Sequence, residues 1–264
     1  MFRCSACAHI QVPSGVALVD GVSIYEAGQL FETDGNQEYY LDEGTLGAAR
    51  DKLRFIERLV DPDHRLLLDL GASYGHFLSV ATGRFESYGV EASAAAVEWG
   101  RREFGVRNLV GSLYDLPPGV PARVDVITAW DVIEHLAEPR EALARCRERL
   151  TTNGWLFMST PDAGSLMAGV LGRRWYYQDP LQHINLFSRR NLARIVEAAG
   201  FSVRETRYFG RQYKVNYILN RLRYLTGGAA RPLFNALMRL PEGVRSAHVT
   251  IKLHDVMGMA AQRR

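Results

Sequence analysis

Short apolar runs alternate with amphipathic stretches of helical period between residues 61 and 160. The first run, HRLLLDL (64–70), is nearly all apolar, which is typical of a strand buried on both faces of a parallel sheet. Further strands are predicted at 87–93, 106–112, 124–130 and 154–162, and helices at 75–82, 94–105 and 138–154. This alternation predicts parallel strands joined by right-handed crossovers, and therefore a doubly wound α/β sheet.

The chain beyond residue 162 first continues this pattern and then departs from it. SRRNLARIVEAAGF (188–201) predicts a helix capped by Ser188 and ended by Gly200, and FSVRETRYFG (201–210) predicts a strand. Four regions are expected. They are an N-terminal extension and cap (1–60), a core (61–210), a basic, partly helical insertion (211–245) and the final strand of the core (246–264).

The composition restricts the class of protein. A chain of 264 residues with 47% hydrophobic residues can bury a full core, and no uncharged run approaches the roughly 20 residues that span a bilayer. The N-terminal MFRCSACAHI lacks the apolar stretch and cleavage site of a secretory signal. Three cysteines, an odd number, argue against a disulfide framework. We therefore expect one main domain in the cytoplasm.

The net charge of +3 conceals an asymmetry along the chain. From Arg204 onward, 12 lysines or arginines stand against three acids, so this segment carries +9 and the remainder −6. A basic segment on an acidic body favours an anionic partner, whether a phosphorylated substrate, a lipid surface or nucleic acid. A solvated helix face would show the same pattern.

The clearest candidate site is the loop after the first strand, in LLLDLGASYGHFLSV (66–80). Ligands of open α/β sheets bind beyond the carboxyl ends of the strands, where Gly71 and Gly75 allow the backbone to approach closely. Glu91 ends the second strand about 20 residues later, where a carboxylate can accept both hydroxyls of a ribose. The two features together predict an adenosine ligand.

Nicotinamide dinucleotides and S-adenosylmethionine both carry adenosine. A dinucleotide site needs G-x-G-x-x-G, because a pyrophosphate lies on the helix N-terminus, whereas this loop reads G-A-S-Y-G. Asp69, two residues ahead of Gly71, would repel a pyrophosphate and attract the ammonium and sulfonium of S-adenosylmethionine. The charge therefore favours S-adenosylmethionine, and disfavours a dehydrogenase.

These motifs resemble those of class I S-adenosylmethionine-dependent methyltransferases. The resemblance covers residues 66–209 and rests on LLLDLGASYGHF, YGVEAS, VGSLYDLP, DVITAWDVIEHL and GWLFMSTPD. It implies a Rossmann-like, seven-stranded, mostly parallel sheet with an N-terminal extension and a helical insertion before the last strand. Ser73 departs from the pattern, because family members often carry glycine there.

The same resemblance implies which residues bind the cofactor. They are Asp69, Gly71, Ala72, Ser73 and Gly75 around the methionine end, Glu91 and Ala92 at the ribose, Ser112 and Leu113 beside the adenine, and Ala129 and Trp130 against the methionine portion. In the family an aspartate often stands where this chain has Ser112, so a weaker partner is expected for the adenine.

A closer resemblance is to ubiquinone-biosynthesis O-methyltransferases and certain sugar methyltransferases, through DVIEHLAEPREAL and QHINLFSRRNL. In part of that branch the residues matching Asp131, Glu134 and His135 are reported to hold a divalent metal. The other interpretation is that Glu134 and His135 organise the loop through hydrogen bonds, and on this interpretation no metal is expected.

The N-terminus carries one Cys-x-x-Cys motif, Cys4 and Cys7, followed by His9. It resembles the latter half of a four-cysteine zinc module found ahead of some sugar and natural-product methyltransferases. A tetrahedral zinc site needs four ligands, and the first pair is missing, so we expect no zinc in the isolated chain.

Methyl transfer from a sulfonium is an in-line displacement, so catalysis consists largely of aligning the acceptor and excluding water. A hydroxyl acceptor also needs a base, and His183 is the first candidate because it precedes the helix predicted beside the cleft. His135, at the end of the fourth strand, is the second candidate. Either could instead be a satisfied structural histidine.

The RRWYYQ cluster (173–178) is a candidate substrate contact. Its members Arg174, Trp175, Tyr176 and Tyr177 could stack on a ring and bind a phosphate or carboxylate, or could form a lid anchored in the core. We predict methyl transfer to a small-molecule acceptor, at a hydroxyl oxygen of an anionic, nucleotide-linked or lipid-linked natural-product or glycan intermediate. The alternatives are an RNA methyltransferase, which the TAWD ending of the fourth strand disfavours, and a non-catalytic binding module.

Overall fold

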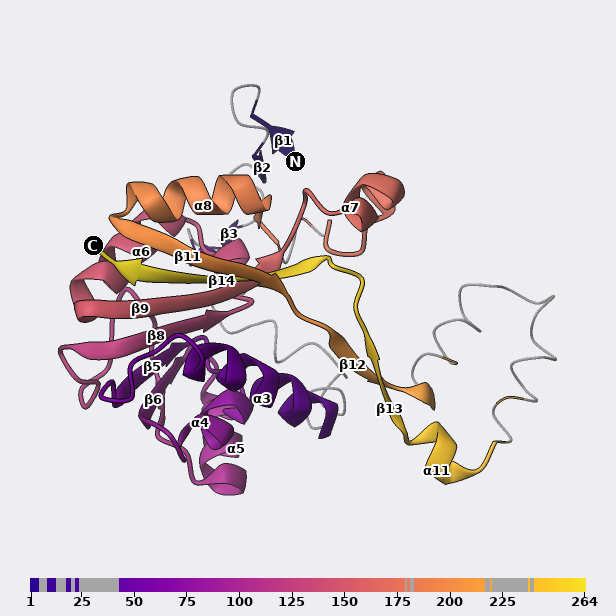
Figure 1. Cartoon of the computed structure of the whole chain (residues 1–264), viewed down its shortest axis with the longest axis horizontal. Coiled ribbons are helices and arrows are strands. Elements are labelled where there is room, and N and C mark those ends of the chain that lie inside the picture. Colours follow the sequence, from indigo (N-terminus) through magenta and orange to yellow (C-terminus); the bar gives the residue numbers. More distant parts are fainter. Residues whose placement is uncertain are drawn as a thin grey trace.

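A seven-stranded sheet forms the centre of the computed structural model, which describes residues 1–4, 9–12, 18–19, 22–23, 43–178, 180, 183–216, 219, 237 and 240–264. Its strands are β5 (Leu66–Leu70), β6 (Glu86–Glu91), β7 (Asn108–Val110), β8 (Val124–Trp130), β9 (Leu150–Pro161), β11 (Phe201–Tyr208) and β14 (Val256–Arg263). They follow the order β11-β14-β9-β8-β5-β6-β7 (Figure 1). The strands β5 to β9 are parallel, and β14 lies antiparallel between β9 and β11. The predicted doubly wound, mostly parallel sheet is confirmed.

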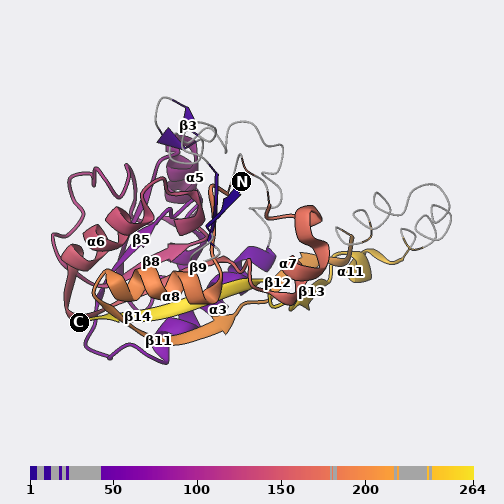
Figure 2. The ribbon, with the colours of Figure 1, turned by 90° about the horizontal axis from the view of Figure 1, so that it is seen from above.

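Helices cover both faces of this sheet (Figures 1 and 2). They are α3 (Glu43–Glu57), α4 (His76–Ala81), α5 (Ala94–Phe104), α6 (Pro139–Arg149) and α8 (Arg189–Ala198). Buried side chains of α6 and α8, such as Leu143 and Leu192, pack against Ile127 on one face. Phe55 of α3 and Phe77 of α4 pack on the other face. The core therefore consists of two apolar layers separated by the sheet.

Capping residues delimit the helices much as the sequence predicted. The Ser93 hydroxyl accepts a hydrogen bond from the N–H of Ala96 at the start of α5, and the Ser188 hydroxyl does the same for Asn191 in α8. Gly105 ends α5 with a left-handed φ of 65°. The helix predicted over 138–154 is shorter, because Leu150 is fully buried and already extended as the first residue of β9.

The strand order reverses between β5 and β8. From β5 the chain proceeds outward through β6 and β7 on one side, and through β8 and β9 on the other. Crossover connections then leave in opposite directions, so that a crevice opens beyond the carboxyl ends of these two strands. The glycine loop after β5 and the segment after β8 both border this crevice.

Smaller elements surround the sheet. They are β1 (Phe2–Arg3), β2 (Ile10–Gln11), β3 (Leu18–Val19), β4 (Val22–Ser23), α7 (Leu166–Leu171), β10 (Asn185–Leu186), β12 (Arg211–Lys214), α11 (Glu242–Arg245), β13 (His248–Ile251) and 3-10 turns at Ile133–His135 and Gly172–Arg174. β2 pairs with β10, and the N–H of Val12 donates to the carbonyl of Ile184 over 2.9 Å. The described N-terminal residues therefore lie beside the segment that follows His183.

Most of the predicted partly helical insertion (211–245) lies outside the described residues, and the described part contains both a strand, β12, and a helix, α11. β12 and β13 pair residue for residue as a two-stranded ribbon that projects from the sheet and leads to α11 (Figure 1). Consequently β13 belongs to the ribbon, and only β14 completes the core, whereas the sequence predicted one core strand over 246–264. The β-branched and aromatic residues of the ribbon, including Tyr213, Val249 and Ile251, favour strands over helix. Within the described ranges, no helix has the length and apolarity to cross a bilayer.

Candidate active site

The loop after β5 contains three left-handed residues, Gly71 (φ 67°), Ser73 (φ 49°) and Gly75 (φ 78°). Glycine adopts this conformation without strain, so among these three residues only Ser73 bears a backbone cost. A Cβ on Gly75 would lie 2.8 Å from Cγ2 of Val106. Gly75 is therefore required for core packing, in addition to the ligand approach that the sequence suggested.

Glu91 fixes this loop from the end of β6. Its two carboxylate oxygens accept backbone N–H groups of Ser73 and Ser93, each over 2.9 Å. Burial raises the pKa of Glu91, and these N–H donors oppose the rise. The side-chain amide of Asn108 donates to the carbonyl of Ser73 over 2.9 Å from the opposite side. The carboxylate therefore has a defined position at the crevice.

Asp69 lies deeper than the sequence suggested. It is 2% exposed, and its Oδ1 accepts the Thr128 hydroxyl over 2.6 Å. Burial raises the pKa of Asp69 to about 7, although the Thr128 hydrogen bond and the Lys52 charge oppose this rise. Lys52 comes from α3, lies 3.7 Å from the Asp131 carboxylate and sits 5.0 Å from the centre of the Trp130 ring. Lys52 was not predicted, because α3 lies outside every motif described above.

The raised pKa of Asp69 predicts a pH dependence of stability. Between about pH 4 and pH 7 the folded chain retains a proton that the unfolded chain has released, so stability falls as pH rises. From pH 5 to pH 8 this group should cost about 2–3 kcal/mol of unfolding free energy. Asp69→Asn should remove that slope in urea unfolding experiments, and the exposed control Asp63→Asn should retain it. Equal slopes for the wild type and Asp69→Asn would contradict the prediction.

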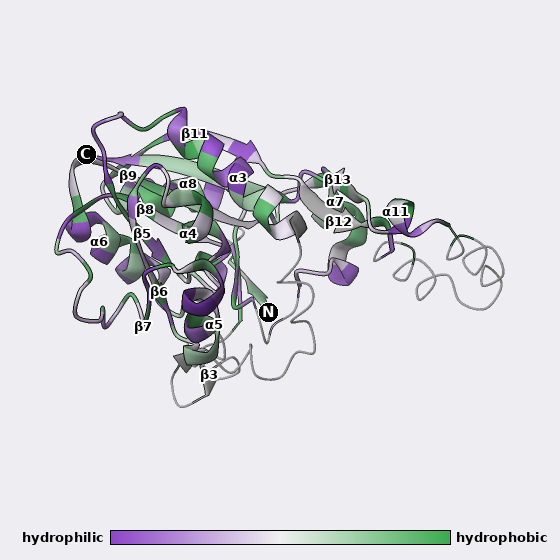
Figure 3. Cartoon of the chain, turned by 90° about the horizontal axis from the view of Figure 1, so that it is seen from below, coloured by the Kyte–Doolittle hydropathy of each residue, from purple (hydrophilic) through white to green (hydrophobic). Residues whose placement is uncertain are grey.

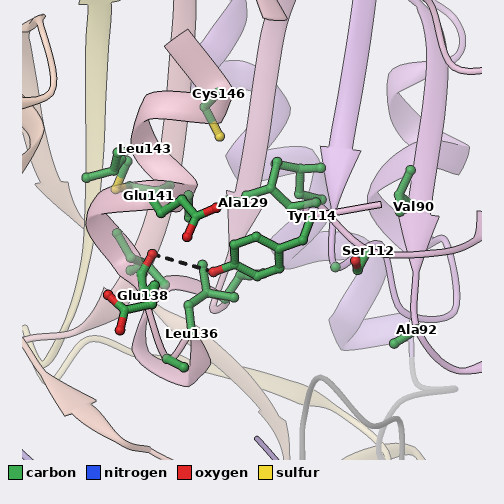
Figure 4. Close-up of a pocket in the computed structure, with 18 of the residues that line it drawn as sticks. Val90, Ala92, Ser112, Tyr114, Ala129, Leu136, Glu138, Glu141, Leu143 and Cys146 are labelled. Carbon is green, nitrogen blue, oxygen red and sulfur yellow. Dashed lines mark hydrogen bonds between the residues drawn. The ribbon is translucent and has the colours of Figure 1, made fainter. Parts of the chain in front are cut away.

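A cavity of about 410 Å³ opens beside Glu91 and extends beneath α6 (Figure 4). Side chains of α6 and β9 form its apolar inner wall, with Leu143, Cys146 and Met158 among them. The Tyr114 ring lies across the cavity, and its hydroxyl donates to the carbonyl of Glu138 over 3.5 Å (Figure 4). The cavity therefore has a polar rim beside the loops and an apolar floor in the core, which suits a flat ring with a polar edge.

Six of the predicted cofactor residues line this cavity: Gly71, Glu91, Ala92, Ser112, Leu113 and Ala129. Asp69, Ala72, Ser73 and Gly75 lie outside its lining. The ring of Trp130 lies in the opposite layer, 5.4 Å from Phe77 and 5.9 Å from Phe209 between ring centres. Successive side chains of a strand point to opposite faces, so Ala129 and Trp130 cannot both face the cavity. The sequence motifs did not indicate the part of the cavity wall that α6 supplies, although Ala142, Leu143 and Cys146 lie on one helix face.

The two candidate bases lie side by side near the crevice. The ring centres of His135 and His183 are 5.0 Å apart. Glu134 lies beside them, and the potential metal-binding atoms of these three residues all lie within 4.8 Å of one another. The triad that the family resemblance implies has Asp131 in place of His183. Asp131 has a left-handed φ of 57° and accepts the Ser159 hydroxyl over 2.9 Å, which turns its carboxylate toward Lys52.

The RRWYYQ segment is divided between core and surface. Trp175 and Tyr177 are 4% and 5% exposed and pack with Leu186 and Val256. Tyr176 is 43% exposed, with its hydroxyl donating to Asp255, and Arg174 is exposed. Trp175 and Tyr177 therefore anchor the segment in the core, whereas Tyr176 and Arg174 remain accessible, and a substrate contact by these two stays a prediction.

The N-terminal cysteine motif is described only in part. Cys4 is an exposed thiol, and Cys7 lies outside the described residues. Nε2 of His9 lies 3.1 Å from Oδ1 of Asn185, and its ring packs against Phe187 at a tilt of 36°, with ring centres 4.9 Å apart. His9 therefore connects the N-terminus to the strand after His183.

Comparison with known proteins adds sequence relatives. The methyltransferase domain family matches residues 44–206. The ubiquinone biosynthesis O-methyltransferase of Thiobacillus denitrificans is 23% identical over 166 residues, which span 58% of this chain and 72% of that protein. An uncharacterized 37.1 kDa protein in transposon TN4556 of Streptomyces fradiae is 31% identical over 195 residues, which span 67% of this chain and 56% of that protein.

Solved structures agree with the fold. An S-adenosylmethionine-dependent methyltransferase from Thermotoga maritima superposes with a TM-score of 0.57 at 16% identity, covering 90% of this chain and all of that one. Another, from Archaeoglobus fulgidus, gives 0.55 at 20% identity, covering 89% of this chain and 99% of that one. The matched family domain covers more than half of the chain, and the strand order and the cavity beside Glu91 agree with it. The chain therefore belongs to the class I S-adenosylmethionine-dependent methyltransferases.

Proposed function

We propose that the cavity beside Glu91 holds the adenosine of S-adenosylmethionine and that the chain transfers the methyl group to a hydroxyl oxygen of a small molecule. The observation that carries this proposal is the Glu91 carboxylate, held by two backbone N–H groups on the cavity wall. A carboxylate in that position can accept the two ribose hydroxyls, since each oxygen retains acceptor capacity. S-adenosylmethionine supplies the electrophilic methyl group, and the chain supplies its position.

The surrounding residues fit the remaining parts of the cofactor. Ser112 and Leu113 would flank the adenine, and Glu141, which lines the same cavity, offers a carboxylate to an exocyclic amine. The indole N–H of Trp130 is buried without a hydrogen-bond acceptor in the described part of the chain, and Lys52 lies over its ring. This ring lies in the layer opposite the cavity, so the methionine portion would lie against Ala129 and the backbone of Trp130.

His183 is our candidate for the general base. Nδ1 of His183 lies 2.9 Å from the carbonyl oxygen of Tyr177, which can only accept a hydrogen bond. A neutral imidazole that donates from Nδ1 has its lone pair on Nε2, which is the state that a base requires. His135 packs against the same ring and would orient it. This arrangement can take the proton of a hydroxyl acceptor during methyl transfer.

The acceptor class is proposed from charge. The segment from Arg204 onward carries the +9 described above, which favours an anionic acceptor, whether nucleotide-linked or lipid-linked. We also propose a cytoplasmic location, because a chain with only three cysteines suits a reducing compartment. The test is a screen with isotope-labelled S-adenosylmethionine against catechols, nucleotide sugars and lipid-linked sugars, with mass spectrometry of the products. A strict preference for neutral or cationic acceptors would contradict an anionic acceptor class.

Metal removal should leave methyl transfer unchanged. Glu134, His135 and His183 are close enough to hold a cation, but our proposal gives His183 the role of a base, which a bound metal would block. We therefore expect full activity after dialysis against EDTA and no increase on adding Mg²⁺. Loss of activity on chelation, with recovery in Mg²⁺, would contradict the base assignment and favour a metal site.

A further inference from the structure

Helix α7 is apolar on both of its sides. Ala168 and Leu171 pack toward the core cluster around Trp175. Leu166 and Val170, four residues apart and thus neighbours on the opposite side, are 82% and 72% exposed. A surface helix of a soluble domain normally carries polar residues on its outer side, and Figure 3 shows α7 coloured as hydrophobic. This outer side therefore lacks the polar residues expected of a surface that faces water alone.

Positive charge adjoins this apolar side. Arg173 and Arg174 follow α7 directly and are both exposed, and residues 163–178 contain no acid. In α11, β13 and the segment after β13, Val244, Val249 and Leu253 are also exposed. Within residues 163–178, apolar side chains next to two arginines match a membrane surface that offers acyl chains beneath anionic headgroups.

We propose that the α7 surface, defined as Leu166, Val170, Arg173 and Arg174, docks the chain on an anionic lipid bilayer. Leu166 and Val170 would enter the headgroup region, while the two arginines would bind lipid phosphates. Nucleic acid would use the arginines but leave the aliphatic side chains in water, and a neutral protein partner would not require the arginines. An anionic lipid surface can bind both the aliphatic side chains and the arginines of the α7 surface.

This surface connects to the catalytic region. The segment after α7 reaches the buried anchors Trp175 and Tyr177, and the Tyr177 carbonyl contacts the His183 ring nitrogen over 2.9 Å. Docking through α7 would therefore bring the acceptor side of the crevice toward the bilayer. An acceptor held in that bilayer could reach the site without leaving the lipid, a consequence that rests on the proposed function.

The test is vesicle flotation with the full chain. We expect the wild type to float with vesicles of phosphatidylglycerol mixed with phosphatidylcholine, and to remain behind with phosphatidylcholine alone. The double variant Leu166→Ser/Val170→Ser should weaken binding by about 20-fold or more. Arg173→Glu and Arg174→Glu should each weaken it by at least about fivefold, and high salt should weaken wild-type binding.

Matched controls change exposed residues elsewhere. Val110→Ser replaces an aliphatic side chain that is 47% exposed on β7, and Arg102→Glu replaces an exposed arginine on α5; both should float like the wild type. Flotation of Leu166→Ser/Val170→Ser like the wild type would overturn the proposal. So would binding to an RNA oligonucleotide with no binding to vesicles, or a wild-type dimer that the same double variant dissociates. Calorimetric binding of S-adenosylmethionine by every variant keeps this result separate from the proposed function.

Discussion

Glu91→Ala should lower the affinity for S-adenosylmethionine by at least about 100-fold, because it removes two hydrogen bonds between ribose hydroxyls and a charged acceptor. Glu91→Gln should be nearly as damaging. Its amide would place an N–H₂ group against the backbone N–H of Ser73 or Ser93, where the carboxylate now accepts both. Calorimetric titration with S-adenosylmethionine and with its demethylated product measures the change directly.

The same strand offers a matched control. Glu86 begins β6, is exposed, and pairs with Arg107 over 2.7 Å far from the cavity. Glu86→Gln should bind the cofactor like the wild type, because surface ion pairs contribute little and this one lies away from the site. If Glu91→Gln bound S-adenosylmethionine within about threefold of the wild type, the ribose would have to lie elsewhere.

Replacing the proposed base, His183, should lower kcat by a factor similar to the loss of cofactor affinity expected for Glu91→Ala. His183→Ala is expected to lower kcat for a hydroxyl acceptor by between about 100-fold and 10,000-fold, while the dissociation constant of S-adenosylmethionine stays unchanged. Added imidazole should restore part of the activity, since the lost group is a proton acceptor. Single-turnover rates with the acceptor identified by the screen give kcat separately from binding.

Variants of two other histidines serve as controls for this experiment. His254→Gln alters a ring that contacts Tyr208, away from the crevice, and should leave kcat unchanged. His135→Gln should lower kcat less than His183→Ala, because His135 orients the base rather than receiving the proton. A purely structural role of His183 would instead show as a lower unfolding temperature, no imidazole rescue and impaired cofactor binding.

The central part of the site was predictable because it is local in sequence. Strand, glycine loop, helix and second strand follow one another within about 25 residues, so a parallel βαβ unit places Gly71 and Glu91 together whatever surrounds them. The apolar strands also predict the sheet, since strands buried on both faces of a parallel sheet read as nearly continuous apolar runs. These features depend on backbone geometry and short connections.

The parts that were not predicted depend on long-range packing. Whether Ala129 or Trp130 faces the ligand depends on which side of the sheet the ligand lies, and strand periodicity leaves that choice open. His183 joins Glu134 and His135 only through the path of the intervening chain, and Lys52 arrives from a helix without a motif. The β12–β13 ribbon likewise required knowledge of its partner strand.

The position of β14 has a consequence for synthesis of the protein. β9 ends at Pro161 and its neighbour β14 begins at Val256, so nearly a hundred residues must leave the ribosome before β9 gains its second partner. Until then two apolar strand edges stay open, and pairing across so long a separation is intrinsically slow. The nascent chain should therefore depend on chaperones until residue 263 emerges, and a translational stall within the ribbon would leave an aggregation-prone intermediate.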